Sequence, residues 1–223
     1  QSEQAHDQAR QVLDASISQY APPGSALQLS SGKPSEVVLE HLQGSDHDLL
    51  VLGGHLERHE FFSGTSLDRI ARNCPVPLLL VAHTSPGPYQ QALAALDFSL
   101  CACSALAGAY GLLAESAELH AVHVFEPDKG SREQIDSQLQ VQQALIAQLL
   151  EDEARLLPPS GPTLSHAVHQ GGILRCLQEQ LRARNSDLLV LGSHGRGALS
   201  QTLLGSLAQH FLHKAPCDVF VVR

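Results

Sequence analysis

Apolar residues along this chain fall into short continuous runs that alternate with longer stretches in which they recur every three or four positions. Runs of four or five, at residues 49–52, 78–82 and 188–191, are typical of strands buried on both faces of a parallel sheet. The stretch 173–184 places its apolar residues on one stripe of a helix. Regular alternation of the two patterns predicts an α/β fold, with an open parallel sheet and helices on both faces.

In the C-terminal part of the chain, this alternation predicts five strands and four helices. Strands are expected at 92–97, 119–125, 164–169, 188–191 and 218–222, and helices at 99–116, 131–157, 173–184 and 206–214. In an open α/β sheet, ligands bind at the carboxyl ends of the strands, where the strand order reverses. Asp97 and Gly192, at or just after the ends of the first and fourth strands, are therefore candidate site residues.

An internal repeat divides the chain. Residues 48–55 (DLLVLGGH) match residues 187–194 (DLLVLGSH) at every position but one, with an offset of 139, and Pro75 and Pro216 are 141 apart. A period of this length corresponds to a whole domain. We therefore predict two tandem copies of one fold: an N-terminal segment of residues 1–83, a linker of residues 84–89, and a C-terminal segment of residues 90–223.

The N-terminal segment matches the second copy only in part. A helix is expected at 3–19, as a counterpart of 131–157, followed by elements at 26–29, 35–42, 49–52, 66–73 and 78–82 in the matching strand and helix order. The first two strands of the copy, and the helix between them, have no counterpart. A sheet without its central strand would expose unpaired backbone. We therefore expect those elements to precede Gln1 in the natural protein.

Composition and charge narrow the range of partners. The chain has 223 residues, 43% of them hydrophobic, and a net charge of -9 from 14 Lys and Arg against 23 Asp and Glu. An acidic chain is a poor match for nucleic acid or for an anionic membrane surface. The five cysteines and 13 histidines form no metal-ligand spacing. We predict reduced cysteines, a cytoplasmic location and no metal site.

A glycine-rich element after the fourth predicted strand carries the main chemical signal. It is spaced Gly-x2-Gly-x9-Gly-Ser, with Gly192, Gly195, Gly205 and Ser206 at the named positions. It is neither a Walker A loop nor a dinucleotide-binding G-x-G-x-x-G. Glycines after a strand let the backbone approach a ligand closely, and the helix that begins near Ser206 offers free amides to phosphate oxygens. The spacing predicts an anion-binding cradle.

The C-terminal segment, which contains these glycines, resembles the universal stress protein family over residues 90–223. The resemblance is carried by residues 96–99 (LDFS), by His123–Val124, by the glycine element and by residues 215–222 (APCDVFVV). The N-terminal segment resembles the same family from its second helix onward. The resemblance implies a five-stranded parallel sheet similar to that of the adenine nucleotide α-hydrolases, in two tandem copies.

The resemblance also implies a stress-response protein that binds ATP, with or without Mg²⁺, as a nucleotide-dependent regulatory module. Asp97 would contact ribose or a metal-bridged phosphate, and the backbone of Val124 would bind the adenine edge. The remaining predicted contacts are made to phosphate and ribose, by Gly192, His194, Gly195, Arg196, Gly205, Ser206 and Leu207. Family members commonly pair through the last strand. Residues 78–82 and 218–222 are therefore expected to pair, within the chain or in a homodimer.

Alternatives remain open at several of these positions. Asp97 and Ser99 could cap the following helix, His194 could be an exposed turn residue, and Arg196 could be a surface charge. Slow ATP hydrolysis and a nucleotide-free dimerisation scaffold are the competing functions, and backbone donors do not distinguish ATP from ADP or AMP.

The N-terminal segment departs from the glycine spacing. It has Leu56 where the second glycine belongs, and only seven residues, 57–63, before Gly64. A branched side chain at that position would crowd the phosphate turn. We expect the N-terminal segment to bind ATP poorly or not at all.

Overall fold

The computed structural model describes residues 2–44, 46–54, 65–82, 87–127, 130–194 and 204–223. Its strands form one seven-stranded sheet in the order β1-β2-β7-β6-β3-β4-β5. The strands are β1 (Leu50–Gly53), β2 (Leu78–Val81), β3 (Gln91–Leu96), β4 (Glu118–Phe125), β5 (Thr163–Gln170), β6 (Leu188–Gly192) and β7 (Asp218–Val222). The helices are α1 (Ser2–Tyr20), α2 (Pro34–Leu42), α3 (Thr65–Asn73), α4 (Leu100–Leu112), α5 (Arg132–Ala154), α6 (Ile173–Ala183) and α7 (Ser206–His213).

The α/β class and the parallel pairing agree with the sequence analysis, but the sheet is larger than expected. The five strands of the C-terminal segment are parallel to one another, in the order β7-β6-β3-β4-β5. They do not end as a separate sheet, because β2 pairs antiparallel with β7, with Leu79 opposite Phe220. The last strands of the two segments therefore pair within this chain, and the sheet has seven strands where five were predicted.

Element positions match the predictions closely, except at residues 26–29, where the predicted strand is absent. In the C-terminal segment the corresponding element is β5, which forms its ladder with β4. The described part of the N-terminal segment contains no counterpart of β4. An isolated run of apolar residues therefore has no strand to pair with and remains extended chain.

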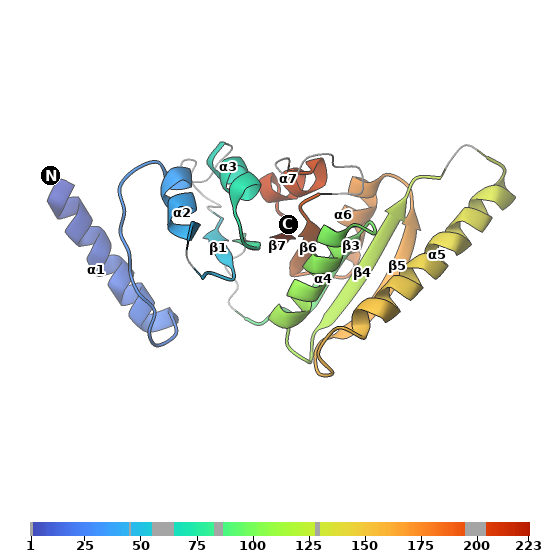
Figure 1. Cartoon of the computed structure of the whole chain (residues 1–223), viewed down its shortest axis with the longest axis horizontal. Helices are drawn as coiled ribbons and strands as arrows, with labels where there is room; N and C mark the ends of the chain where they lie inside the picture. The colour runs from blue at the N-terminus through green and yellow to red at the C-terminus, as the bar shows by residue number, and fades with distance from the viewer. Residues whose placement is uncertain (1, 45, 55–64, 83–86, 128–129, 195–203) are drawn as a thin grey trace.

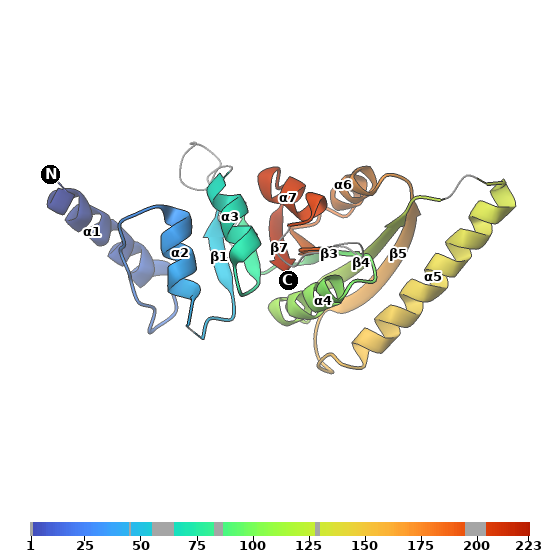
Figure 2. The same ribbon diagram turned by 45° about the horizontal axis from the view of Figure 1, so that its top comes forward.

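Two helical layers cover the sheet, as Figures 1 and 2 show. Helices α2, α3, α6 and α7 lie on one face, and α4 and α5 lie on the other. Helix α1 lies at one end, and its described side chains are almost all exposed. Because the strands are covered on both faces, β6 and β7 are apolar and buried along almost their whole length.

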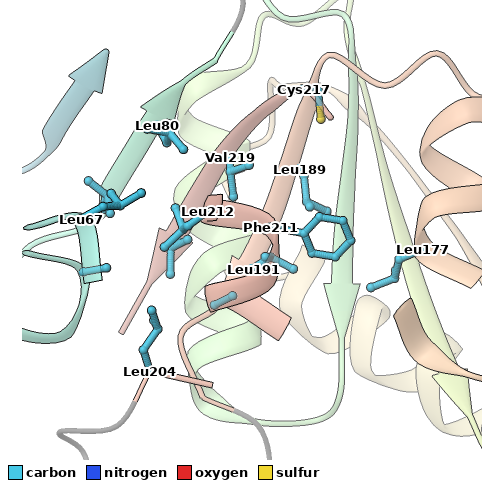
Figure 3. Close-up of a cluster of buried hydrophobic side chains, with 14 of the residues drawn as sticks. Leu67, Leu80, Leu177, Leu189, Leu191, Leu204, Phe211, Leu212, Cys217 and Val219 are labelled. Carbon is cyan, nitrogen blue, oxygen red and sulfur yellow. The ribbon is translucent and has the colours of Figure 1, made fainter. Parts of the chain in front are cut away.

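One hydrophobic cluster runs continuously across the two segments on the α7 face. Figure 3 shows Leu67 of α3 and Leu80 of β2 beside Leu212 of α7, with Phe211 directed toward Leu177 of α6. Phe211 is fully buried and Leu212 nearly so. Helix α7 is therefore packed between a helix of the N-terminal segment and a helix of the C-terminal segment.

Two buried or half-buried carboxylates fix the chain where one segment passes into the next. Asp218 accepts hydrogen bonds from the Ala82 amide at 2.8 Å and from the Tyr89 hydroxyl at 2.7 Å. Asp187 accepts hydrogen bonds from the amides of Gln90, at 2.7 Å, and Gln91, at 3.0 Å. Burial raises the pKa of Tyr89, and its bond to Asp218 raises it further, so the phenol stays protonated as a donor.

Candidate functional site

The strand order reverses at β3, which lies between β4 and β6. From β3 the chain builds outward through β4 to β5, and then crosses back to β6 and β7 on the other side. The carboxyl ends of β3 and β6 are consequently neighbours, with Ala94 opposite Val190 in the ladder. This brings Asp97 and Gly192 to one edge of the sheet, the position that the alternating pattern had predicted for a ligand.

A cavity of about 530 Å³ opens at this edge. Its walls come from the ends of β3, β4 and β6 and from the first turns of α6 and α7, and they are mostly apolar. The lining residues are Ala95, Leu96, Asp97, Ala102, Val122, Val124, Ile173, Leu174, Leu177, Leu191, Gly192, Ser193, His194, Gly205, Ser206, Leu207, Ala208 and His210. A volume of this size is within the range of small-molecule sites.

Seven of the nine residues predicted for the site line this one cavity. They are Asp97, Val124, Gly192, His194, Gly205, Ser206 and Leu207. Gly195 and Arg196 lie outside the described residues. The seven come from positions up to 110 residues apart in the chain, and the fold alone brings them together.

The turn after β3 holds Asp97 by hydrogen bonds to Ser99. One carboxylate oxygen, Oδ1, accepts from the Ser99 amide at 3.1 Å and from its hydroxyl at 2.5 Å. Ser99 is also the N-cap of α4, because its Oγ accepts from the Ala102 amide at 3.2 Å. Ser99 therefore caps the helix, as one interpretation had it, while Asp97 lies at the cavity wall and supports that cap.

The imidazole of His123 contacts the residues on either side of Asp97 in the same turn. Its Nδ1 donates to the Leu96 carbonyl at 2.7 Å, and its ring meets Phe98 edge-on with centroids 4.8 Å apart. Phe98 has a φ of 63°, which is uncommon for a bulky residue. A backbone in this region persists only where its surroundings hold it, and such residues cluster at functional sites. His123 thus fixes the backbone on both sides of Asp97.

The absence of a side chain at Gly192 has a packing cause. A Cβ at this position would lie 2.7 Å from the Ala102 amide nitrogen and 2.9 Å from the Cys101 carbonyl carbon. Both are backbone atoms of α4, which cannot move aside without shifting the helix. Gly192 lines the cavity, as predicted, but its glycine is required by the close approach of α4.

A backbone hydrogen bond joins the two ends of the glycine element. The Gly205 amide donates to the Ser193 carbonyl at 2.8 Å, and the Ser193 amide donates to the Val222 carbonyl of β7 at 2.7 Å. Gly205 is the N-cap residue of α7 and has no side chain to accept from the first-turn amides. The amides of Ser206 and Leu207 therefore begin a helix at the cavity wall, where a helix dipole favours an anion.

Two imidazoles of the cavity lining carry buried nitrogens with no hydrogen-bond partner among the described residues. These are Nε2 of His194 and Nε2 of His210. The other ring nitrogen of His194 lies 2.7 Å from Ser193 Oγ, and burial, followed by the nearby Arg223, lowers the pKa of His194. The ring of His194 is therefore neutral near pH 7, and it is half-buried rather than exposed.

Sequence reasoning missed several lining residues. Ala208 and His210 follow Ser206 by two and four positions, so the first turns of α7 could have suggested them. Ile173, at the start of α6, is 44% exposed beside the cavity, whereas the sequence pattern placed it only on the apolar stripe of its helix. The amino end of α6 reaches the cavity because β5 leads into it at the same sheet edge.

Val124 lies at the cavity where the pairing of β4 with β3 ends. The ladder between β4 and β3 ends at His123, opposite Leu96, whereas the ladder between β4 and β5 continues to Phe125. β4 therefore extends two residues beyond the end of β3. Val124 lines the cavity at this end of β4, one position beyond the last residue of β4 that is in register with β3.

No group of three or more His, Cys, Asp or Glu side chains in the described ranges is placed to hold a metal ion. No helix of the described part combines the length and apolar character needed to cross a bilayer.

Comparison with known proteins gives the family. The model of the universal stress protein family matches residues 88–223, which is more than half of the sequence. The chain therefore belongs to the universal stress protein family.

Individual relatives agree with this assignment. The chain is 46% identical over 44 residues to universal stress protein Slr1101 of Synechocystis, covering 20% of this chain and 41% of that protein. It is 29% identical over 110 residues to universal stress protein A homolog 2 of Coxiella burnetii, covering 48% of this chain and 75% of that protein.

A solved structure extends the likeness of fold to the whole chain. A universal stress protein from Archaeoglobus fulgidus aligns with 99% of this chain and 78% of its own, with a TM-score of 0.67 and 18% identity. At this identity the likeness concerns the fold alone.

Proposed function

We propose that the C-terminal segment binds an adenine nucleotide, ATP, in the cavity at the ends of β3, β4 and β6, and that the protein acts as a nucleotide-dependent regulatory module of a stress response. The observation that carries the proposal is the convergence of seven predicted nucleotide contacts on a single cavity beside the first turn of α7. Spacing of the glycine element predicts phosphate binding at Gly192, Gly205 and Ser206, and the family resemblance implies the other four contacts.

The lining divides into parts suited to different parts of a nucleotide. Val122, Val124 and Ile173 offer an apolar wall for the base, and the backbone of Val124, at the end of β4, is the proposed hydrogen-bonding partner of the adenine rim. Asp97, at the end of β3, is suited to the ribose hydroxyls or to a Mg²⁺ ion that accompanies the phosphates. The amides of Ser206 and Leu207, with the Ser206 hydroxyl, are suited to phosphate oxygens.

The chemistry of the lining favours binding over turnover. Among the described lining residues, Asp97 supplies the one carboxylate, and no lysine or arginine is present. Phosphoryl transfer needs positive charge on the transferred group and a residue that orients the nucleophile. Slow ATP hydrolysis is accordingly the second candidate and a nucleotide-free scaffold the third. The scaffold gains support from the β2–β7 pairing alone.

We also propose that residues 1–83 and 90–223 are tandem domains of this family, joined by residues 84–89. Supporting observations are the sequence repeat, the whole-chain likeness to a solved family member, and the pairing of equivalent last strands. All five cysteines are free thiols, which is consistent with a reducing compartment such as the cytoplasm.

Calorimetric titration of the chain with ATP in the presence of Mg²⁺, followed by a phosphate-release assay on the same sample, tests the nucleotide proposal. The expected result is one saturable site per chain with little or no phosphate released. Steady turnover would instead favour the enzyme. No heat of binding at millimolar ATP, ADP or AMP would refute nucleotide binding and leave the scaffold.

A further inference from the structure

Helix α7 connects the candidate site to the N-terminal segment. Its first turn lines the cavity through Ser206, Leu207 and Ala208. Farther along, the same helix contacts α3, which belongs to the N-terminal segment and lies beside α7 in both ribbon views. A change in the position of α3 would therefore be transmitted to the wall of the cavity.

Asp68 of α3 makes the polar contacts of this interface. His213 Nε2 donates to Asp68 Oδ1 at 2.9 Å, and the Gln209 side-chain amide lies 3.4 Å from each carboxylate oxygen of Asp68. Asp68 and His213 are 23% and 32% exposed, so water competes only partly for this contact. One carboxylate thus holds two consecutive turns of α7.

Apolar contacts reinforce the same interface. Leu67, next to Asp68, belongs to one buried cluster with Leu204 and Leu212, as Figure 3 shows. Leu204 immediately precedes Gly205, the N-cap residue of α7, and is only 8% exposed. The residue that leads into the first turn of the helix is therefore buried in a core that the N-terminal segment helps to form.

Helix α7 has little means of fixing its own position. It has eight residues and begins at a glycine without a capping side chain. A helix of this length is marginal by itself and takes its place from tertiary packing. The copies also differ at the contact, because the 141-residue offset makes Gln209 the counterpart of Asp68. The carboxylate is therefore present in the N-terminal segment and absent at the matching position of α7.

We infer that Asp68 is a positioning residue for the nucleotide site of the other segment: through Gln209 and His213 it sets where the first-turn amides of α7 meet the ligand. The inference rests on the proposed function. The N-terminal segment departs from the glycine spacing, and on this inference its role is to hold α7 in place at the nucleotide site of the C-terminal segment.

The test compares Asp68→Ala with a matched control, Glu36→Ala, in the full chain. Glu36 forms an ion pair with Arg69 at 3.0 Å within the N-terminal segment. Asp68→Ala is expected to weaken ATP binding about 3- to 10-fold and to speed hydrogen exchange at the amides of residues 206–213, whereas Glu36→Ala changes neither. Asp68→Asn keeps an acceptor oxygen for His213 and is expected to restore most of the affinity.

A double-mutant cycle sharpens the result. If Asp68 acts through His213, the losses in affinity from Asp68→Ala and His213→Ala are expected to be non-additive. Wild-type affinity together with wild-type exchange in Asp68→Ala would overturn the inference, and so would a loss of affinity without any change in α7 exchange.

The same measurements distinguish a failure of the proposed nucleotide binding from a failure of the positioning role of Asp68. A wild-type chain that ignores ATP refutes nucleotide binding, and the exchange of α7 in Asp68→Ala then decides the positioning role alone. His213→Ala, which removes the same contact from the α7 side, provides the exchange comparison if Asp68→Ala does not fold.

Discussion

The two segments carry the same sequence at the same strand end, yet the fold uses it differently. Gly53 ends β1 and Gly192 ends β6, each after the run DLLVL. In the described part of the chain, nothing lies within 4 Å of a Cβ placed on Gly53, whereas a Cβ on Gly192 would strike the backbone of α4. The same motif therefore leaves space around its glycine in the N-terminal segment, whereas in the C-terminal segment the glycine is packed against α4.

The next residue shows where the two segments remain alike. The Gly54 amide donates to the Val81 carbonyl of β2 at 2.6 Å, and its counterpart Ser193 donates to the Val222 carbonyl of β7 at 2.7 Å. The backbone turn is thus conserved between the segments, while the surroundings differ. A glycine motif specifies a turn, and the elements packed against it determine whether a cavity forms there.

The largest expected effect is a stability difference between two matched substitutions. Gly192→Ala would place a methyl group 2.7 Å from the Ala102 nitrogen, so we expect it to lower the free energy of unfolding by about 3 kcal/mol, the upper end for overpacking. Gly53→Ala meets open space and is expected to change stability by less than about 1 kcal/mol. Urea denaturation of both variants measures the difference, and equal losses would contradict the comparison.

A pH effect is expected in a part of the C-terminal segment that has no described counterpart in the N-terminal one. Burial, and then Arg184, lower the pKa of His120 to about 4 from an ordinary value near 6.5. Between these values the unfolded chain binds the additional proton and the folded chain does not, so stability falls as the pH drops from about 6.5 to about 4.

The loss is on the order of 2–3 kcal/mol for a pKa difference of this size. Unfolding curves recorded across this pH range measure it. His120→Gln is the control, because it cannot bind the proton and should flatten this part of the profile. An unchanged profile in His120→Gln would assign the effect to other groups.

A smaller effect is expected where His123 holds the turn that presents Asp97. His123→Ala removes the hydrogen bond to the Leu96 carbonyl and the ring contact with Phe98. We expect a loss of about 1–2 kcal/mol in stability and a several-fold weaker affinity for ATP. His166→Ala, at an exposed position of β5, is the control and should change neither. Calorimetry and thermal unfolding separate the two effects, and an unaltered affinity in His123→Ala would argue against a role for the turn.

The smallest effect tests the anion-binding end of α7. Ser206→Ala removes one hydroxyl from the cavity wall and is expected to weaken ATP binding by about 0.5–1.5 kcal/mol, with little change in stability. Its sequence counterpart in the N-terminal segment is Thr65, and Thr65→Ala should leave the affinity unchanged. Equal weakening in both variants would indicate that the N-terminal segment also takes part in binding.

Sequence alone predicted much of the fold and of the site's membership. The apolar runs located β6 and β7 to within one residue, because a strand covered on both faces needs apolar side chains throughout. Spacing of the glycines pointed to Gly192, Gly205 and Ser206, since turn formation and helix initiation are local properties. Local information did not reveal His210 or Ile173, whose place at the cavity depends on how whole helices lie.

Only the tertiary structure decided how the two segments combine. The missing strand at 26–29 and the seven-stranded sheet have the same cause. A strand forms only where it can pair with another strand, and that partner is distant in sequence. The chain determined its elements through short-range periodicity. The packing of α7 between α3 and α6, and with it the shape of the cavity, arose from burial of apolar surface shared between segments more than 100 residues apart.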